Sequence, residues 1–486
     1  MKRSLRLAAA ASCALLLLPS AALPTLRADV DRSGPPAPGP EPAASFPDYQ
    51  QRVLPNGLKV FVVESHLQPT VTFRLLLKSG DAADPAGRPG VADAAASLLN
   101  RGTAKRDAAT FAEATDFIGA SVEAGTAEDY TEVTASGLVK DLPRLLDLFT
   151  DAALHPTFPA DELAKYQRQA ISSLVQSKQR PGTLSARLRG KLIYGDKHPY
   201  GDFPTEESLG ALTREDLVKF HAQHFSPDNA TLAIVGDVKT DDMLAEVTKA
   251  FADWKVAASD AARARPLPPV PPLPEKTTVH LVDRPGSVQS NILVSRRAVA
   301  RDNPDVPELG VLNSVLGGGA SGRLFQNLRE QHGYTYGSSS SFGTNRYGGL
   351  FSASAEVRTE VTVPAIEEIF NEIRRIDAEP VPDPELGMQR RYLAGSYLLS
   401  LESPARTASR VQEIDFYGLP ADYYKTYASR VGKVTPGQVK QLADKYLAGE
   451  GWTIVVVGEA KEIKSSLEKL GPVVVYDTDL KSLPTP

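Results

Sequence analysis

Cysteine is almost absent from this chain of 486 residues. The single one, Cys13, lies in an apolar stretch near the amino terminus. If that stretch is removed, the remaining chain has no thiol, which excludes disulfide bonds and cysteine-ligated metal. After residue 28 the sequence also lacks any run of about 18 consecutive apolar residues, the minimum for a membrane-spanning helix. We therefore expect a soluble protein without a membrane span.

Excess positive charge is lacking as well. The net charge is −5, and the first 28 residues carry four basic side chains and no acidic one, which leaves about −9 for the rest. A chain with this charge is a poor ligand for nucleic acid or for an anionic membrane surface. Nucleic acid and membranes are therefore excluded as main partners.

The amino terminus has the pattern of a secretory signal peptide. Met1-Lys2-Arg3 is a short basic region, Leu7 to Leu18 is apolar, and small residues follow, with Ala22 and Ala28 as possible cleavage sites. The pattern predicts that residues 1–28 are removed on export. Export without disulfides favours a periplasmic or secreted bacterial protein.

Two proline-rich stretches divide what remains. Residues 29–47 are rich in Pro, Ala and Gly and predict a disordered or polyproline spacer. Residues 263–275 contain a second proline-rich stretch, which predicts a stiff linker. We therefore expect two large domains, at residues 48–262 and 276–480.

The two predicted domains resemble copies of each other. The segment from Leu212 to Asp237 matches the segment from Val434 to Glu459 without a gap, at a constant offset of 222 residues. Each copy has a polar residue before an amphipathic helix, then a turn and an apolar strand. Matches at a fixed spacing indicate an internal duplication.

Strand and helix patterns alternate along both halves. Runs rich in β-branched residues predict strands, and apolar residues at helical spacing predict helices. The predicted strands are 58–63, 71–78, 130–136, 231–235, 277–282 and 453–457, and the predicted helices are 110–118, 142–153, 161–176, 215–225, 241–254, 363–376 and 461–470. This mixture predicts an α+β architecture with helices covering one face of antiparallel or mixed sheets.

Several short motifs occur in a fixed order along residues 47–480. They are Leu54-Pro55-Asn56-Gly57-Leu58-Lys59-Val60, Gly80, Pro89-Gly90, Gly102-Thr103, Gly119-Ala120, His198-Pro199-Tyr200-Gly201, Val235-Gly236-Asp237, Leu316-Gly317-Gly318-Gly319, Gly322-Arg323-Leu324-Phe325 and Leu328-Arg329-Glu330. In this order the chain resembles the pitrilysin/insulinase family of zinc metallopeptidases, in its two-domain, processing-peptidase-like branch. The resemblance implies two homologous domains, each a duplicated sheet-plus-helices unit, that form half of a clamshell.

The family's zinc motif, H-x-x-E-H on one helix, is degenerate in this chain. The resemblance places Asp93 and Ser97 at the two histidines and Ala96 at the glutamate that activates water. The third ligand position falls near Ser173, and the acid that supports it near Tyr166. One carboxylate with alanine and serine does not supply the three protein ligands of a catalytic zinc. The resemblance implies that this chain binds no metal and that zinc is bound by a partner subunit.

The family's second catalytic element is retained. Active members use an arginine and a tyrosine with the spacing R-x6-Y, and Arg329 and Tyr336 have this spacing. A fixed cation and a phenol can donate hydrogen bonds to the substrate and to the oxyanion that develops on it. Tyr334 is the alternative tyrosine if the register differs. Together with Gly318 and Gly319 of the glycine-rich loop, Tyr334 is expected to line the path of the peptide.

Two hypotheses about function follow from the resemblance. In the first, the chain is the catalytically incomplete subunit of a heterodimeric periplasmic metallopeptidase. Its partner would be a homologous subunit bearing H-x-x-E-H, and its substrates peptides or unfolded segments. In the second, it is a non-enzymatic peptide-binding or scaffold protein of the same fold. A self-sufficient hydrolase has no support, because no G-x-S-x-G elbow or other catalytic signature is present.

Overall fold

The computed structural model describes residues 45–256 and 267–484, which we call the first half and the second half. The predicted signal peptide at residues 1–28, the spacer up to residue 44 and the start of the predicted linker lie outside these residues and remain predictions. The rest of the predicted linker, residues 267–275, contains no helix or strand.

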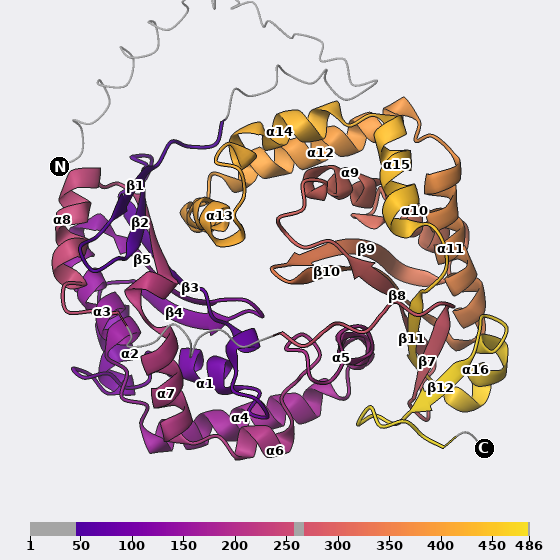
Figure 1. Cartoon of the computed structure of the whole chain (residues 1–486), viewed down its shortest axis with the longest axis horizontal. Helices are drawn as coiled ribbons and strands as arrows, with labels where there is room; N and C mark the ends of the chain where they lie inside the picture. Colours follow the sequence, from indigo (N-terminus) through magenta and orange to yellow (C-terminus); the bar gives the residue numbers. More distant parts are fainter. Residues whose placement is uncertain (1–44, 257–266, 485–486) are drawn as a thin grey trace, which may run out of the picture. The chain divides into compact units, whose positions relative to one another are not determined.

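The first half contains one six-stranded sheet with helices packed against it (Figure 1). Its strands, in spatial order, are β1 (Gln50–Val53), β2 (Lys59–Glu64), β6 (Ala230–Gly236), β3 (Thr70–Leu77), β5 (Thr131–Leu138) and β4 (Ser121–Thr126). Its helices are α1 (Val91–Ser97), α2 (Ala108–Phe117), α3 (Leu142–Leu154), α4 (Ala160–Ser177), α5 (Pro181–Tyr194), α6 (Glu206–Gly210), α7 (Arg214–His224) and α8 (Thr240–Ala250). Strand β6 is buried along its whole length, as its apolar sequence predicts.

The second half contains a second six-stranded sheet. Its strands, in spatial order, are β12 (Val473–Tyr476), β7 (Thr278–Asp283), β11 (Thr453–Gly458), β8 (Gln289–Ala298), β10 (Gly348–Arg358) and β9 (Thr335–Asn345). Its helices are α9 (Val306–Gly317), α10 (Arg323–Phe325), the π-helix η5 (Gln326–Gln331), α11 (Thr362–Ala378), α12 (Asp383–Ser400), α13 (Pro404–Tyr417), α14 (Tyr423–Lys433), α15 (Pro436–Leu447) and α16 (Ala460–Leu467). Strand β11 is buried along its whole length, like β6.

The two sheets repeat each other strand by strand. β2 is parallel to β6, which is antiparallel to β3, and β7 is likewise parallel to β11, which is antiparallel to β8. Both sheets end in an antiparallel pair, β5 with β4 and β10 with β9. They differ at the opposite edge, where β1 is antiparallel to β2 but β12 is parallel to β7. The predicted duplication and the α+β class are confirmed. Each half holds a single sheet, so the repeated unit is a whole half of the chain.

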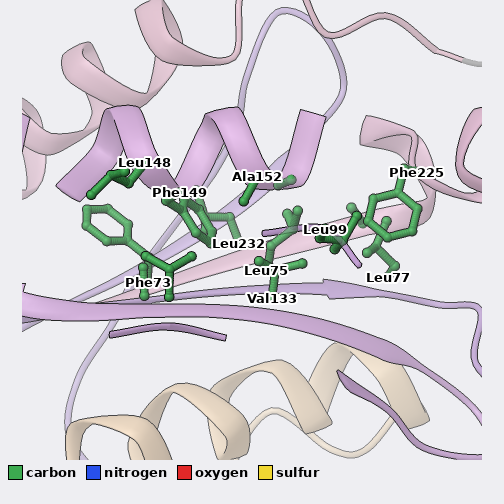
Figure 2. Packing of buried hydrophobic residues seen from close by; sticks show 14 of the residues in the cluster. Phe73, Leu75, Leu77, Leu99, Val133, Leu148, Phe149, Ala152, Phe225 and Leu232 are labelled. Carbon is green, nitrogen blue, oxygen red and sulfur yellow. The ribbon is translucent and has the colours of Figure 1, made fainter. Parts of the chain in front are cut away.

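Alternation along the strands builds the main core of the first half. Phe73 and Leu75 of β3 point to one face of the sheet, where they lie beneath Phe149 of α3 (Figure 2). The rings of Phe73 and Phe149 are stacked, with centroids 5.5 Å apart. A corresponding core in the second half joins its sheet to α9, α11 and α15. Each sheet therefore has one face covered by helices of its own half, as the sequence predicts.

The opposite face of each sheet is covered by a helix from the other half. Helix α5, from the first half, packs on β8 and β11, where Leu184 and Leu188 contact Val455. Helix α13, from the second half, packs on β3 and β6, where Val411 joins a cluster with Ala233. The two halves thus exchange one helix each. The order of the elements along the chain did not predict this exchange.

Across both described ranges, no helix is long and apolar enough to cross a membrane.

Candidate functional site

Helix α1 carries the segment that aligns with the family's zinc motif. It begins after Gly90, whose φ of 103° favours glycine. Asp84 accepts hydrogen bonds from the backbone N–H groups of Gly90 (2.6 Å) and Ala92 (2.7 Å), which fixes the start of the helix. Burial raises the pKa of Asp84 to about 7, against the effect of these two donors.

The degenerate motif positions form a hydrogen bond in place of a metal centre. Asp93 is exposed, Ala96 is buried and Ser97 is half-buried. Tyr166 of α4 donates its phenol O–H to Asp93 Oδ2 at 2.6 Å. Burial and the charge of Asp93 raise the pKa of Tyr166 above its usual range, so the phenol remains a donor. Asp93, at the position of the first histidine, therefore accepts a hydrogen bond from Tyr166, at the position of the supporting acid.

Ser173 does not complete a ligand set. It lies seven residues beyond Tyr166 on α4, about 10 Å along the helix axis. It is exposed and lines a shallow hollow of about 350 Å³ with Arg168 and Gln169. Within residues 45–256 and 267–484 there is no group of three or more His, Cys, Asp or Glu side chains that could hold a metal. The residues at the motif positions do not fit a catalytic zinc, which needs three protein ligands.

Arg329 lies on the π-helix η5, which packs against the edge strand β9. Its guanidinium lies over the ring of Phe325, 4.9 Å from the centroid, and 3.5 Å from a carboxylate oxygen of Glu330. The side chain is 47% exposed. One face of the guanidinium is therefore held by an aromatic contact, while about half of the side chain stays accessible.

The two candidate tyrosines lie in different surroundings. Tyr336 is the second residue of β9 and is 90% exposed. Tyr334 is half-buried, packs against the core of the second half, and stacks on His332 with centroids 4.9 Å apart. The accessible phenol is therefore that of Tyr336. The functional roles of both tyrosines remain predictions.

The glycine-rich loop begins where α9 ends. Gly318 and Gly319 are exposed. Gly317 is buried, and a Cβ added to it would lie 2.5 Å from the backbone nitrogen of Ser340 in β9. Gly318 and Gly319 were predicted from the sequence to line the peptide path and Gly317 was not, although its lack of a side chain lets α9 approach β9. The run of three glycines is the signal, and the packing shows that a Cβ on Gly317 would meet β9, whereas a Cβ on Gly318 would lie 2.7 Å from Cα of Ser314 in α9 itself.

Comparison with known proteins gives the class to which this fold and site belong. Residues 59–191 match the family described as Insulinase (Peptidase family M16), and residues 211–393 match the Peptidase M16 inactive domain. The chain is 25% identical over 425 residues to the uncharacterized zinc protease SCO5738 of Streptomyces coelicolor, covering 86% of this chain and 91% of the relative. It is 24% identical over 358 residues to the uncharacterized zinc protease YmxG of Bacillus subtilis, covering 73% and 85%.

Two solved structures share the fold. One is a peptidase M16 inactive domain from Pseudomonas fluorescens, with a TM-score of 0.77 and 28% identity, covering 85% of this chain and 98% of that one. The other is a protease from Helicobacter pylori, with a TM-score of 0.78 and 19% identity, covering 85% and 99%. At that identity the second likeness concerns the fold alone.

The chain belongs to peptidase family M16, the insulinase family. The resemblance inferred from the sequence is confirmed. Because its zinc-motif helix has Asp93, Ala96 and Ser97 where the motif needs two histidines and a glutamate, it is a catalytically incomplete, peptidase-like member.

Proposed function

We propose that this chain is the subunit of a heterodimeric zinc peptidase that binds no zinc. Its partner is a homologous subunit that carries H-x-x-E-H and the metal. The substrates are peptides or unfolded polypeptide segments. In this assembly the present chain contributes Arg329 and Tyr336 to the substrate bound by the partner.

One contrast carries the proposal. At the positions of the family's metal centre, Asp93 accepts a hydrogen bond from Tyr166, and the general base is replaced by the buried Ala96. The arginine and tyrosine with the family spacing are present, and Tyr336 is 90% exposed. A large aromatic side chain so exposed at an edge strand buries little apolar surface, so its presence is better explained by binding than by folding.

The chemistry asked of these two residues is hydrogen-bond donation. An arginine presents several N–H groups and stays protonated, and a phenol adds one O–H. Aimed at the scissile carbonyl, they stabilise the negative charge that develops there during peptide hydrolysis. The partner's zinc supplies the activated water. The M16 inactive domain matched by residues 211–393 fits pairing with an active M16 subunit.

The place of action belongs to the same proposal. The basic start of the chain and the apolar run from Leu7 to Leu18 support export to the periplasm or the medium. A reading frame beside this gene that encodes a homologue with an intact H-x-x-E-H is the partner to test first.

The decisive experiment measures peptide hydrolysis by the co-expressed pair. Arg329→Ala and Tyr336→Phe should each lower kcat/KM about 10²-fold, as expected for the loss of an oxyanion donor. Matched controls are Arg374→Ala, an exposed arginine on α11, and Tyr392→Phe, an exposed tyrosine on α12, and both should retain wild-type turnover. Size-exclusion chromatography checks that the pair still assembles. Wild-type turnover in both test variants would remove Arg329 and Tyr336 from the mechanism.

Metal analysis of the purified chain provides a second test. Alone, it should hold no stoichiometric zinc and cleave no peptide, because its motif lacks ligands and base. One tightly held zinc per chain would refute the proposal. Peptide binding that needs no protease partner, together with no hydrolysis by any pair, would instead support the scaffold hypothesis.

A further inference from the structure

A partly open cavity of about 590 Å³ lies between helix α5 and strands β9 and β10, away from α1 and its degenerate motif. The helix contributes Arg187, Arg189 and Tyr194 to its lining, and the strands contribute Ser341 and Ser352. It exists because α5, the helix that the first half places on the second sheet, packs on β8 and β11. The end of the sheet formed by β9 and β10 is left uncovered beside α5.

Two arginines in this lining have no acidic partner. Arg187 donates to the carbonyl oxygen of Pro204 at 2.7 Å, and Arg189 donates to Ser352 Oγ at 3.0 Å. Both bonds go to neutral acceptors, and no described carboxylate lies within 4.0 Å of either guanidinium. Burial lowers the pKa of both side chains, and at Arg189 the charge of Glu128 opposes this effect without cancelling it. Buried charge is costly unless an opposite charge compensates it, so this arrangement favours an anionic ligand.

Each arginine also has a free donor group. The Nε atoms of Arg187 and Arg189 are buried and unbonded. One terminal nitrogen of each is used, Nη2 of Arg187 and Nη1 of Arg189. The other terminal nitrogen makes no hydrogen bond to the described residues and is absent from the buried unpaired atoms, so it is accessible from the cavity. Arg187 and Arg189 are two residues apart on α5, so each guanidinium group offers its own donors to an oxygen of a ligand in the cavity.

The charge of the lining selects the ligand. Against the two arginines stands one carboxylate, Glu128, so the cavity carries a single net positive charge. A monovalent carboxylate neutralises it, whereas a divalent phosphate would leave an excess of negative charge. Guanidinium groups match the planar geometry of a carboxylate.

The edge strand indicates where the carboxylate comes from. Ser341, Gly343 and Asn345 of β9 also line the cavity, and β9 is the last strand of its sheet, with no other strand of the described residues paired beyond it. An extended peptide can pair with such an edge and place its last residue in the cavity. We infer that this cavity binds the free C-terminal carboxylate of an extended peptide. The inference needs no protease partner and goes beyond the proposed function.

The test compares two peptides that differ only at the carboxyl end. A five-residue peptide of glycine, serine and alanine, labelled with fluorescein at its amino end, is made as the free acid and as the amide. Fluorescence anisotropy with the purified mature chain at low salt gives both Kd values. The acid should bind about ten- to a hundredfold more tightly, the range for a hydrogen-bonded charge pair. Equal affinity of acid and amide overturns the inference without any mutation.

Substitutions then locate the site. Arg189→Gln should abolish the preference for the acid, and Arg189→Lys should restore part of it, because lysine keeps the charge but not the planar fork. The matched control is Arg296→Gln, a second arginine whose pKa burial lowers and which lies outside the lining. It should keep the wild-type preference. A preference that survives Arg189→Gln places the carboxylate elsewhere and overturns the assignment.

Competition separates the possible sources of the anion. Acetate should displace the peptide only at concentrations far above the peptide Kd, because it lacks the backbone that pairs with β9. Displacement at equal concentrations would assign the site to a small organic acid and overturn the peptide assignment. Tighter binding of inorganic phosphate than of the peptide would contradict the charge argument.

Discussion

Gln412 is the buried polar contact of helix α13 with the sheet of the other half, beside the more exposed ion pairs of Asp415 with Lys59 and Lys78. It is fully buried on α13. Its Oε1 accepts from Arg74 Nη1 at 2.7 Å, and its Nε2 donates to the carbonyl oxygens of Thr231 (2.8 Å) and Arg74 (3.1 Å). Gln412→Ala leaves these three buried groups without that partner. At about 1–3 kcal/mol for each unsatisfied group, and with some relaxation, the expected loss of stability is about 3–5 kcal/mol.

The measurement is urea unfolding, supported by thermal melts. The change should lower the melting temperature by roughly 3–5 °C, because the unfolding entropy of a unit of this size is large. Gln412→Met keeps the length of the side chain but removes the hydrogen bonds, so it should be destabilised nearly as much as Gln412→Ala. Gln441→Ala, at an exposed position on α15, should change stability by less than about 0.5 kcal/mol. If Gln412→Met is as stable as the wild type, the hydrogen bonds do not stabilise the exchange of helices and this reasoning is wrong.

Two further predictions concern the second half. Gly317→Ala should destabilise the protein by about 1–3 kcal/mol, because the new Cβ would lie 2.5 Å from the nitrogen of Ser340. Gly310→Ala in the same helix, where the added Cβ meets nothing within 4 Å, should be neutral or slightly stabilising in the same melts, and equal losses at both sites would contradict the packing. Burial lowers the pKa of His280 to about 4 from its ordinary 6.5. The folded state therefore keeps this histidine neutral, and its contribution is complete above about pH 6.5 and falls by about 2–3 kcal/mol as the pH drops to 4.5. Urea midpoints at pH 7.5 and 4.5 should differ less in His280→Gln than in the wild type, and an unchanged difference would exclude His280 as a cause of acid destabilisation.

Local patterns were enough to place the central strands of both sheets and several of the helices. The predicted strands at 231–235 and 453–457 are the buried strands β6 and β11, because uninterrupted apolar β-branched runs fit a strand covered on both faces. The constant offset of 222 residues between the halves appears as the repeated strand order. The predicted helix at 241–254 is shorter, since α8 ends at Ala250.

The rest depended on contacts distant in sequence. Nothing in the sequences of helices α5 and α13 says which sheet their apolar residues cover. The sequence placed Asp93 and Tyr166 at two degenerate positions, but the hydrogen bond between them needs α1 and α4 to be adjacent in space. The cavity arginines were missed because an unpaired arginine is recognisable only when its surroundings are known.

The exchange of helices makes the duplicated halves indivisible. If the chain were cut between the two halves, the first fragment would lose α13, which covers Phe61 and Ala233. The second fragment would lose α5, which covers Leu293 and Val455. Each would then present a bare apolar sheet to water and tend to aggregate. Each fragment therefore needs the other to cover its sheet, and a cut between the halves would not by itself give two stable proteins.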